Sequence, residues 1–230
     1  YFVERDKTPR DENGEYDYEA LEAIDLAQLN DHLRRLSAGE SVDIPRYDFI
    51  TGKRQWHENP LQLDERSVLI MEGIHALNPK LTEQIPEQWK YRVYVSAMTQ
   101  IAIDDQNIIR SSDNRLIRRM VRDYKFRGYS ALETLRRWPS VRAGEQKHIF
   151  PYQENADVMF NSSLPYELAI MKKYAYPMLK AVPPTNPGYS IAHRLSKFLN
   201  YIYSTDALDE VPPASLLREF VGGSCYARKE

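Results

Sequence analysis

The feature that most constrains the fold is a short apolar run, Val68 to Met71, which ends in Glu72 and Gly73. An uninterrupted apolar run of this length, bounded by polar residues, is typical of a parallel strand that is buried on both faces. It therefore predicts an α/β protein. It also places the carboxylate of Glu72 at the carboxyl end of a strand, where open α/β sheets bind their ligands.

The rest of the chain alternates between strands and helices, as a parallel sheet requires. Residues 91–96 and 156–160 are predicted to form two further strands. Residues 41–56 alternate between apolar and polar side chains but contain Pro45 and a turn at Gly52, which predicts an edge hairpin. Helices are predicted at 20–36, 79–85, 98–109, 113–127, 130–138, 164–181, 190–203 and 214–221.

Length, charge and cysteine content narrow the class of protein. The chain has 230 residues, which suits one large domain or one domain with an appendage. Its formal net charge of -2 argues against a dedicated nucleic-acid binder, which is usually basic. The single cysteine, Cys225, excludes an internal disulfide and is consistent with a reducing, cytoplasmic compartment. No apolar stretch approaches the roughly 18 residues of a membrane span.

The most informative polar feature is a stripe of arginines. Arg115, Arg118, Arg119 and Arg122 follow the spacing i, i+3, i+4, i+7, so they share one face of a helix. Like charges at such spacings cost roughly 0.2–0.5 kcal/mol per pair, so the stripe needs an anion from elsewhere. The apolar side chains of the same helix are expected on the opposite face: Leu116, Ile117, Met120, Val121 and Tyr124.

Three interpretations of this stripe remain open. Arginine carries a rigid fork of donors that matches two phosphate oxygens at a time, which favours a phosphate clamp. The first alternative is a surface stripe paired with acidic side chains of the same fold. The second alternative is a contact to nucleic acid.

Several segments occur in the order seen in one enzyme family. The most specific are RYDF at 46–49, the strand ending in Glu-Gly-Ile at 72–74, and the stripe RR-x-x-RD-x-x-x-RG at 118–128. Together they resemble the uridine kinase branch of the phosphoribulokinase/uridine kinase family of P-loop kinases, over about residues 1–180.

The resemblance implies a fold and an activity. The fold would be an α/β, parallel-sheet P-loop kinase core, incomplete at its amino terminus, with a β-hairpin substrate region and a helical lid. The kinase domain would cover residues 1–183, and a C-terminal helical extension would cover residues 184–230. The activity would be transfer of the γ-phosphate of ATP, with Mg²⁺, to a hydroxyl group of a nucleoside-like small molecule, in a protein that could be a homo-oligomer.

A bacterial subgroup is also similar. Its features are a Trp-Pro-Ser-Val segment, here at 138–141, and a carboxyl-terminal Phe-Val-Gly-Gly-Ser-Cys, here at 220–225. In that subgroup, nucleoside kinases follow an amino-terminal region that resembles part of threonyl-tRNA synthetase.

The resemblance gives the charged residues separate roles. Arg122 and Arg127 match lid arginines that contact ATP phosphates, with Arg118 beside them, and Arg119 matches a catalytic arginine that reaches the substrate. These roles agree with the chemistry of the stripe, because phosphoryl transfer needs positive charge around the transferred oxygens. Glu72 matches a catalytic carboxylate that helps to hold Mg²⁺ through water and the triphosphate; a polar strand end bonded to backbone is the alternative.

A second set of positions is implied for the acceptor. Tyr47 and Phe49 match aromatic residues that line the nucleoside pocket, since alternate residues of a strand share one face. Glu19 lies where the family has an aspartate that binds sugar hydroxyls. Tyr129 takes the place of a base-side arginine, and Arg137 lies near another substrate-side position, with a surface charge on a helix as the alternative.

Two departures from the family pattern affect substrate choice. The histidine that contacts the pyrimidine base in the family falls on Gly52, and the base-side arginine falls on Tyr129. A site that reads a base by hydrogen bonds loses discrimination when its donors are absent. Selectivity for uridine or cytidine is therefore expected to be poor or redirected.

The phosphate-cradling motif G-x-x-x-x-G-K-[ST] is absent from the 230 residues. The family also places its catalytic aspartate just before the Tyr1-Phe2 pair. Because the chain begins at Tyr1 rather than Met, we expect a longer protein in which these parts precede it, and we expect this chain alone to be inactive. A pseudokinase is one alternative, and a non-catalytic nucleotide- or RNA-binding module that uses the arginine stripe is another.

Overall fold

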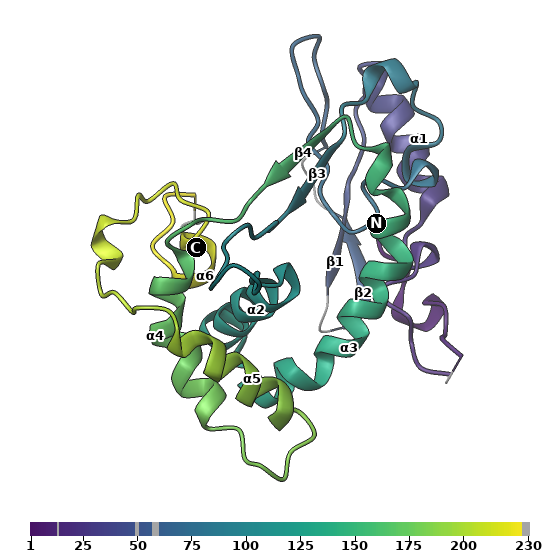
Figure 1. Cartoon of the computed structure of the whole chain (residues 1–230). Coiled ribbons are helices and arrows are strands. Elements are labelled where there is room, and N and C mark those ends of the chain that lie inside the picture. Colours follow the sequence, from purple (N-terminus) through teal and green to yellow (C-terminus); the bar gives the residue numbers. More distant parts are fainter. Residues whose placement is uncertain (13, 49–50, 57–59, 227–230) are drawn as a thin grey trace. The chain divides into compact units, whose positions relative to one another are not determined.

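The computed structural model describes residues 1–12, 14–48, 51–56 and 60–226. These residues form an α/β fold whose helices and strands are labelled in Figure 1. The chain divides into two compact units. Unit 1 comprises Tyr1–Tyr94 and Ala143–Met159, and unit 2 comprises Val95–Arg142 and Phe160–Glu230.

The amino-terminal part of unit 1 contains the helix α1 and a hairpin. The helix α1 (Leu26–Ser37) begins where the Asp25 carboxylate accepts a hydrogen bond from the backbone N–H of Gln28, at 3.0 Å. The strands β1 (Pro45–Asp48) and β2 (Lys53–Trp56) pair antiparallel, which confirms the predicted edge hairpin. Short 3₁₀ helices complete the unit: η1 (Arg5–Lys7), η2 (Leu21–Ala23), η3 (Pro79–Thr82), η4 (Glu87–Trp89) and η5 (Phe150–Asn155).

Two further strands form a parallel pair. The backbone carbonyl of Arg92 accepts from the N–H of Val158, and that of Ser96 accepts from the N–H of Ser162, at 3.3 and 2.8 Å. The strands β3 (Val93–Ser96) and β4 (Val158–Asn161) therefore run in the same direction. They confirm the strands predicted at 91–96 and 156–160 and the α/β class with a parallel sheet.

The strand predicted from the apolar run is not formed. No strand is assigned over residues 67–73, and Val68 and Ile70 are 84% and 86% exposed. A buried parallel strand is held by backbone hydrogen bonds to a neighbour on each side. Among the described residues, no such ladder reaches the run, so that prediction is wrong. Glu72 therefore ends an exposed segment without regular secondary structure.

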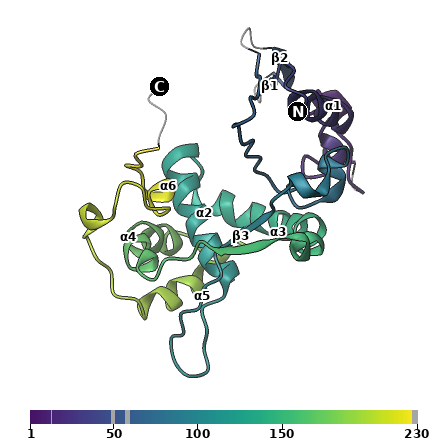
Figure 2. The ribbon, with the colours of Figure 1, turned by 90° about the horizontal axis from the view of Figure 1, so that it is seen from above.

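Unit 2 is built from helices around one core, and α2, α4, α5 and α6 lie together in Figure 2. Ile117, Met171 and Leu195, from three of these helices, are 0% exposed. No described helix is long and apolar enough to cross a membrane. The helices of this unit are α2 (Ser111–Arg127), most of α3 (Ala131–His148), α4 (Glu167–Lys180), α5 (Tyr189–Asn200), η6 (Leu208–Glu210) and α6 (Arg218–Val221).

Unit 2 contains residues on both sides of the predicted division after residue 183. Leu195 and Leu199 of α5, and Leu217 and Phe220 near the chain end, belong to the same buried cluster as the apolar side chains of α2. The helix α5 packs on α4, and α6 packs on α2. The helices α5 and α6 thus bury their apolar faces in this shared core, and residues 184–230 belong to unit 2.

The helix predicted at 98–109 is a loop. The Asp104 carboxylate accepts hydrogen bonds from the backbone N–H groups of Gln106 and Asn107, at 2.9 and 2.8 Å. The backbone N–H of Ile103 also donates to the carbonyl of Asn107, at 2.7 Å. Bonds from an aspartate side chain to nearby backbone compete with helix formation, which accounts for the wrong prediction.

Candidate functional site

The predicted site residues fall into two groups, one in each unit. Unit 2 contains the arginines of α2 together with Tyr129 and Arg137. Unit 1 contains Glu19, Tyr47 and Glu72. Phe49, the other predicted aromatic residue of the nucleoside pocket, lies outside the described residues.

The arginine stripe of α2, Arg115, Arg118, Arg119 and Arg122, lines a cavity of about 210 Å³ in unit 2, which we call the arginine pocket. No acidic side chain is among the described residues that line it. Several guanidinium groups around one small cavity, without a carboxylate in its wall, are typical of an anion site. The polar and aromatic side chains that line the pocket are Ser96, Arg115, Arg118, Arg119, Arg122, Trp138, Ser162 and Phe220.

The register of α2 is fixed by its apolar face. Ile117, Met120 and Val121 are 0% exposed, as the spacing predicts, so the arginines between them face the pocket. Tyr124 was expected on the same buried face but is 58% exposed. The buried cluster contains no residue of α2 beyond Val121, so the last turn of this helix lies past the core.

The end of α2 sets the position of Tyr129. Gly128 has a φ of 68°, the left-handed conformation that commonly ends a helix, and Tyr129 N–H donates to the carbonyl of Asp123 at 3.1 Å. The guanidinium of Arg137 then lies over the ring of Tyr129, at 4.5 Å from its centroid. Tyr129 and Arg137 thus contact each other, and neither lines the arginine pocket.

Arg118 is occupied by partners inside unit 2. Its Nε donates to Glu167 Oε2 at 2.8 Å, and its two terminal nitrogens donate to the hydroxyl and carbonyl of Ser162 at 3.0 and 2.5 Å. Arg118 is 7% exposed and Glu167 only 1%. Arg118, which is predicted to contact phosphate, thus joins α2 to α4 and to the residue that follows β4, and it also lines the arginine pocket.

The remaining arginines also lie near carboxylates. Arg119 and Arg127 share Asp123, at 3.4 and 3.1 Å, and Arg122 Nη1 lies 3.2 Å from Glu219 Oε1. These pairs support part of the alternative in which the stripe is neutralised within the fold. The pairing of Arg122 is incomplete, because its buried Nε has no hydrogen-bond acceptor among the described residues. A buried N–H without an acceptor costs about 1–3 kcal/mol, so an anion oxygen would be stabilised there.

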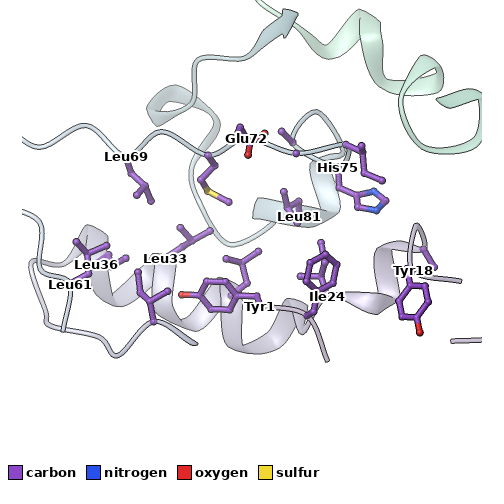
Figure 3. Close-up of a pocket in the computed structure, with 18 residues that line it drawn as sticks. Tyr1, Tyr18, Ile24, Leu33, Leu36, Leu61, Leu69, Glu72, His75 and Leu81 are labelled. Carbon is purple, nitrogen blue, oxygen red and sulfur yellow. The ribbon is translucent and has the colours of Figure 1, made fainter. Parts of the chain in front are cut away.

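In unit 1, Glu72 lines an apolar cavity of about 370 Å³, shown in Figure 3. Leu69 and Glu72 lie on one side of this cavity and Tyr1 and Leu33 on the other. The described residues contain no group of three or more His, Cys, Asp or Glu side chains that could hold a metal ion. Mg²⁺ commonly binds one or two carboxylates and keeps water and substrate phosphates as its other ligands. Glu72, which is exposed, fits that role as a single protein ligand.

Glu19 lies where three segments of unit 1 meet. His75 Nε2–H donates to the backbone carbonyl of Glu19 at 3.0 Å, and the His75 ring meets His148 edge-on, with centroids 5.0 Å apart. Burial lowers the pKa of both histidines. A Cβ at Gly144 would overlap the Glu19 carboxylate, lying 2.9 Å from its Cδ, so this carboxylate packs directly on the backbone of α3.

The contact between Glu19 and Gly144 was not predicted from the sequence. A glycine inside a helix costs about 1 kcal/mol relative to alanine, so its presence indicates a close approach by another group. The position of Gly144 within α3 indicates such a close approach, but the sequence does not show that Glu19 is the approaching residue.

The hairpin places two predicted substrate positions. The ring of Tyr47 meets that of Phe2 edge-on at 5.5 Å, and Phe2, not Tyr47, lines the cavity of unit 1. Gly52 has a φ of 71° in the turn, and a Cβ there would lie 2.8 Å from side-chain atoms of Arg5. The turn therefore favours glycine, and it could not present the histidine of the family pattern without rearrangement.

Comparison with known proteins identifies the family. The model of the phosphoribulokinase / uridine kinase family matches residues 3–168. The chain belongs to this family. It is also similar to two proteins described as uridine kinase. The one from Clostridium botulinum (strain Langeland / NCTC 10281 / Type F) is 27% identical over 161 residues, which is 69% of each chain. The one from Staphylococcus aureus (strain JH9) is 27% identical over 160 residues, again 69% of each chain.

These comparisons confirm the family resemblance derived from the sequence and support a kinase-like phosphotransferase. The family match spans the hairpin, Glu72 and all of α2, and it stops at residue 168, early in α4. The helices α5 and α6 therefore lie beyond the matched region.

Proposed function

We propose that the chain is part of a kinase that transfers the γ-phosphate of ATP, with Mg²⁺, to a hydroxyl group of a nucleoside-like small molecule. In this proposal the arginine pocket binds phosphate oxygens of the nucleotide. Family membership supports the reaction class. The observation that carries the role of the pocket is the buried Nε of Arg122, which has no acceptor among the described residues.

The arginines supply charge rather than covalent chemistry. Phosphoryl transfer is accelerated mainly by positioning and by positive charge around the transferred oxygens. Arg119 and Arg122 line the pocket and contribute that charge there, and Arg127 adds to it from the last turn of α2. Arg118 holds the helix in place through Glu167.

On the acceptor side, Glu19 binds hydroxyl groups of the sugar, and Tyr47 and Phe49 contact the ring. When Mg²⁺ is bound it neutralises charge on the phosphates, and Glu72 is the protein group that would hold it. Tyr129 and Arg137 contribute to the substrate side as a stacked pair.

Selectivity among bases is expected to be weak. The structure has a turn glycine at Gly52 and a tyrosine stacked on Arg137 at position 129, so neither presents the hydrogen-bonding group of the family pattern. Stacking tolerates any aromatic face, whereas lost hydrogen bonds no longer penalise a wrong base.

We also propose that the 230 residues alone do not transfer phosphate, because they contain no G-x-x-x-x-G-K-[ST] segment. The test compares this chain with a longer polypeptide that carries a P-loop ahead of Tyr1. Both are assayed with Mg·ATP and with uridine, cytidine, adenosine, guanosine and inosine. We expect transfer only by the longer polypeptide, and base preferences far below the roughly 10⁴-fold that a hydrogen-bonding site can reach.

Each part of the proposal has its own contradicting result. Equal turnover by both polypeptides would overturn the inactivity of the chain. A preference of about 10⁴-fold for uridine and cytidine would overturn the inference on base selectivity. Phosphorylation of none of the nucleosides would overturn the acceptor class.

The arginine pocket is tested by Arg122→Ala in the same longer polypeptide. A hydrogen bond to a charged group is worth about 1.5–3 kcal/mol, so kcat/KM for ATP should fall by about 10- to 100-fold. The matched control is Arg136→Ala, since Arg136 is exposed on α3 and does not line the pocket. Equal kinetics of the two variants, with unchanged circular dichroism, would favour a surface role for Arg122.

A further inference from the structure

The arginine pocket has a wall that lies outside the family match. The helix α6 follows residue 168 by some fifty residues, yet its Phe220 lines the pocket, with its ring centroid 5.2 Å from the guanidinium carbon of Arg118. The next residue back, Glu219, places Oε1 3.2 Å from Arg122 Nη1. This is the same guanidinium whose Nε lacks an acceptor in the described structure.

The backbone of α6 is fixed to unit 2. Leu217 and Val221 are 0% and 4% exposed in the shared core. Lys125 Nζ donates to the carbonyl of Val221 at 2.7 Å, and Arg218 Nη2 donates to the carbonyl of Val211 at 2.6 Å. The helix is therefore a permanent wall of the pocket rather than a detachable lid.

The carboxylate of Glu219 is held much less firmly than the helix that carries it. Its side chain is 59% exposed, against 28% for Arg122. An ion pair this close to solvent contributes only about 0.2–1 kcal/mol, so breaking it requires little free energy. Rotation of one side chain, with α6 in place, is enough to release Arg122.

We propose that Glu219 is an internal competitor for the anion that binds the arginine pocket. Carboxylate and phosphate oxygens accept from a guanidinium in the same geometry, so both cannot occupy the same Nη1 donor of Arg122 at full strength. The carboxylate occupies that donor in the empty pocket and leaves it when a phosphate binds. The inference rests on the proposed phosphate-binding function and adds a residue that sets its affinity.

The expected change in phosphate affinity is small, because the ion pair between Glu219 and Arg122 is weak. A ligand that binds only the released form has an apparent affinity reduced by the fraction of molecules in that form. For an exposed pair this reduction is about two- to fivefold. Glu219→Gln should therefore tighten phosphate binding by about two- to fivefold, since the amide keeps the shape of the side chain but loses its charge.

The test is isothermal titration of inorganic pyrophosphate into the 230-residue chain at constant ionic strength. The variants are Glu219→Gln, Arg122→Ala and the double variant, with Glu210→Gln as the matched control. Glu210 is an exposed carboxylate on η6 that does not line the pocket. We expect tighter binding only for Glu219→Gln, weaker binding for Arg122→Ala, and no effect of Glu219→Gln when Arg122 is already alanine.

The outcomes separate the two claims. Unchanged or weaker binding by Glu219→Gln, while Arg122→Ala weakens it, would overturn the competitor role alone. An equal gain from Glu210→Gln, or a gain that persists in the double variant, would also overturn it, because net charge rather than the pair would be responsible. No effect of Arg122→Ala, or no binding of pyrophosphate by the unaltered chain, would overturn the proposed function itself.

Discussion

The helices of unit 2 and the apolar run at 67–73 of unit 1 differ in how deeply their apolar side chains are buried. In unit 2, Ile117, Met120 and Leu195 are 0% exposed, whereas in unit 1 Val68 and Ile70 are 84% and 86% exposed. A helix satisfies its backbone hydrogen bonds within itself, so amphipathic helices of unit 2 can assemble by packing their apolar faces. A strand depends on hydrogen bonds from its neighbours. This difference explains why the buried face of α2 could be predicted from its own spacing, whereas a buried strand at 67–73 could not be predicted from the apolar run alone.

The largest expected effect comes from the buried ion pair of unit 2. Glu167→Ala would leave the Arg118 guanidinium buried without its carboxylate, which typically costs about 3–5 kcal/mol in the free energy of unfolding. Glu219→Ala, which removes a mostly exposed carboxylate from Arg122, should cost no more than about 1 kcal/mol. Urea denaturation followed by circular dichroism measures both. Equal costs would mean that Arg118 is not the structural arginine of the stripe.

The next prediction compares a buried side chain of α2 with an exposed side chain of the apolar run at 67–73. Met120→Ala removes a fully buried side chain and should lower the free energy of unfolding by about 2–5 kcal/mol. Ile70→Ala alters an exposed side chain and should change it by less than about 0.5 kcal/mol. A loss at Ile70 as large as that at Met120 would show that residues 67–73 are buried in solution, and the contrast would disappear.

A smaller effect is expected where the Glu19 carboxylate packs on α3. Alanine is favoured over glycine inside a helix by about 0.8–1 kcal/mol, so Gly144→Ala should stabilise α3 by that amount once Glu19 has also been replaced by alanine. With Glu19 present the gain should be smaller, because the carboxylate must move away. Thermal unfolding of the four proteins in this cycle gives the coupling, and a gain independent of Glu19 would contradict the contact.

The smallest effect concerns pH. Burial lowers the pKa of His75 and of His148. The charge of His148 lowers the pKa of His75 further, and the charge of Lys147 does the same for His148. The carboxylates of Asp17 and Glu22 act in the opposite direction on both histidines. Below about pH 6.5 these histidines bind protons more readily in the unfolded chain than in the folded chain. Their contribution to the free energy of unfolding is therefore fully present above that pH and is lost on acidification. Comparison of unfolding at pH 7.5 and 5.5 should show a shallower pH dependence for His148→Gln. An unchanged slope would exclude His148 as a source of it.

Much of the fold and part of the site could be predicted from the sequence. The spacing of Leu116 to Val121 identified the buried face of α2, and the proline and turn signals identified the hairpin. The strand predicted for the apolar run at 67–73 was wrong because a strand of this kind depends on hydrogen bonds to segments that are distant in sequence. The helix predicted at 98–109 was wrong because the Asp104 side chain accepts hydrogen bonds from nearby backbone N–H groups.

The roles within the stripe were beyond prediction. Arg118 and Arg122 have equivalent spacing on α2, and only the tertiary structure shows that one meets the buried Glu167 and the other the exposed Glu219. Both carboxylates lie far from the stripe in sequence. Local spacing does not predict contacts between residues that are distant in sequence. The structure was therefore needed to separate one structural arginine of the stripe from several candidate phosphate-binding arginines.

The central claim is that the arginine pocket binds phosphate oxygens. It is tested most directly by following the arginine Nε–H resonances of the 230-residue chain during titration with inorganic pyrophosphate. If phosphate oxygens bind in the pocket, the resonances of Arg119 and Arg122 should shift and saturate, while those of Arg136 and Arg66, which lie outside the pocket, should stay unchanged. Shifts spread evenly over surface arginines, or none in the pocket, would contradict it.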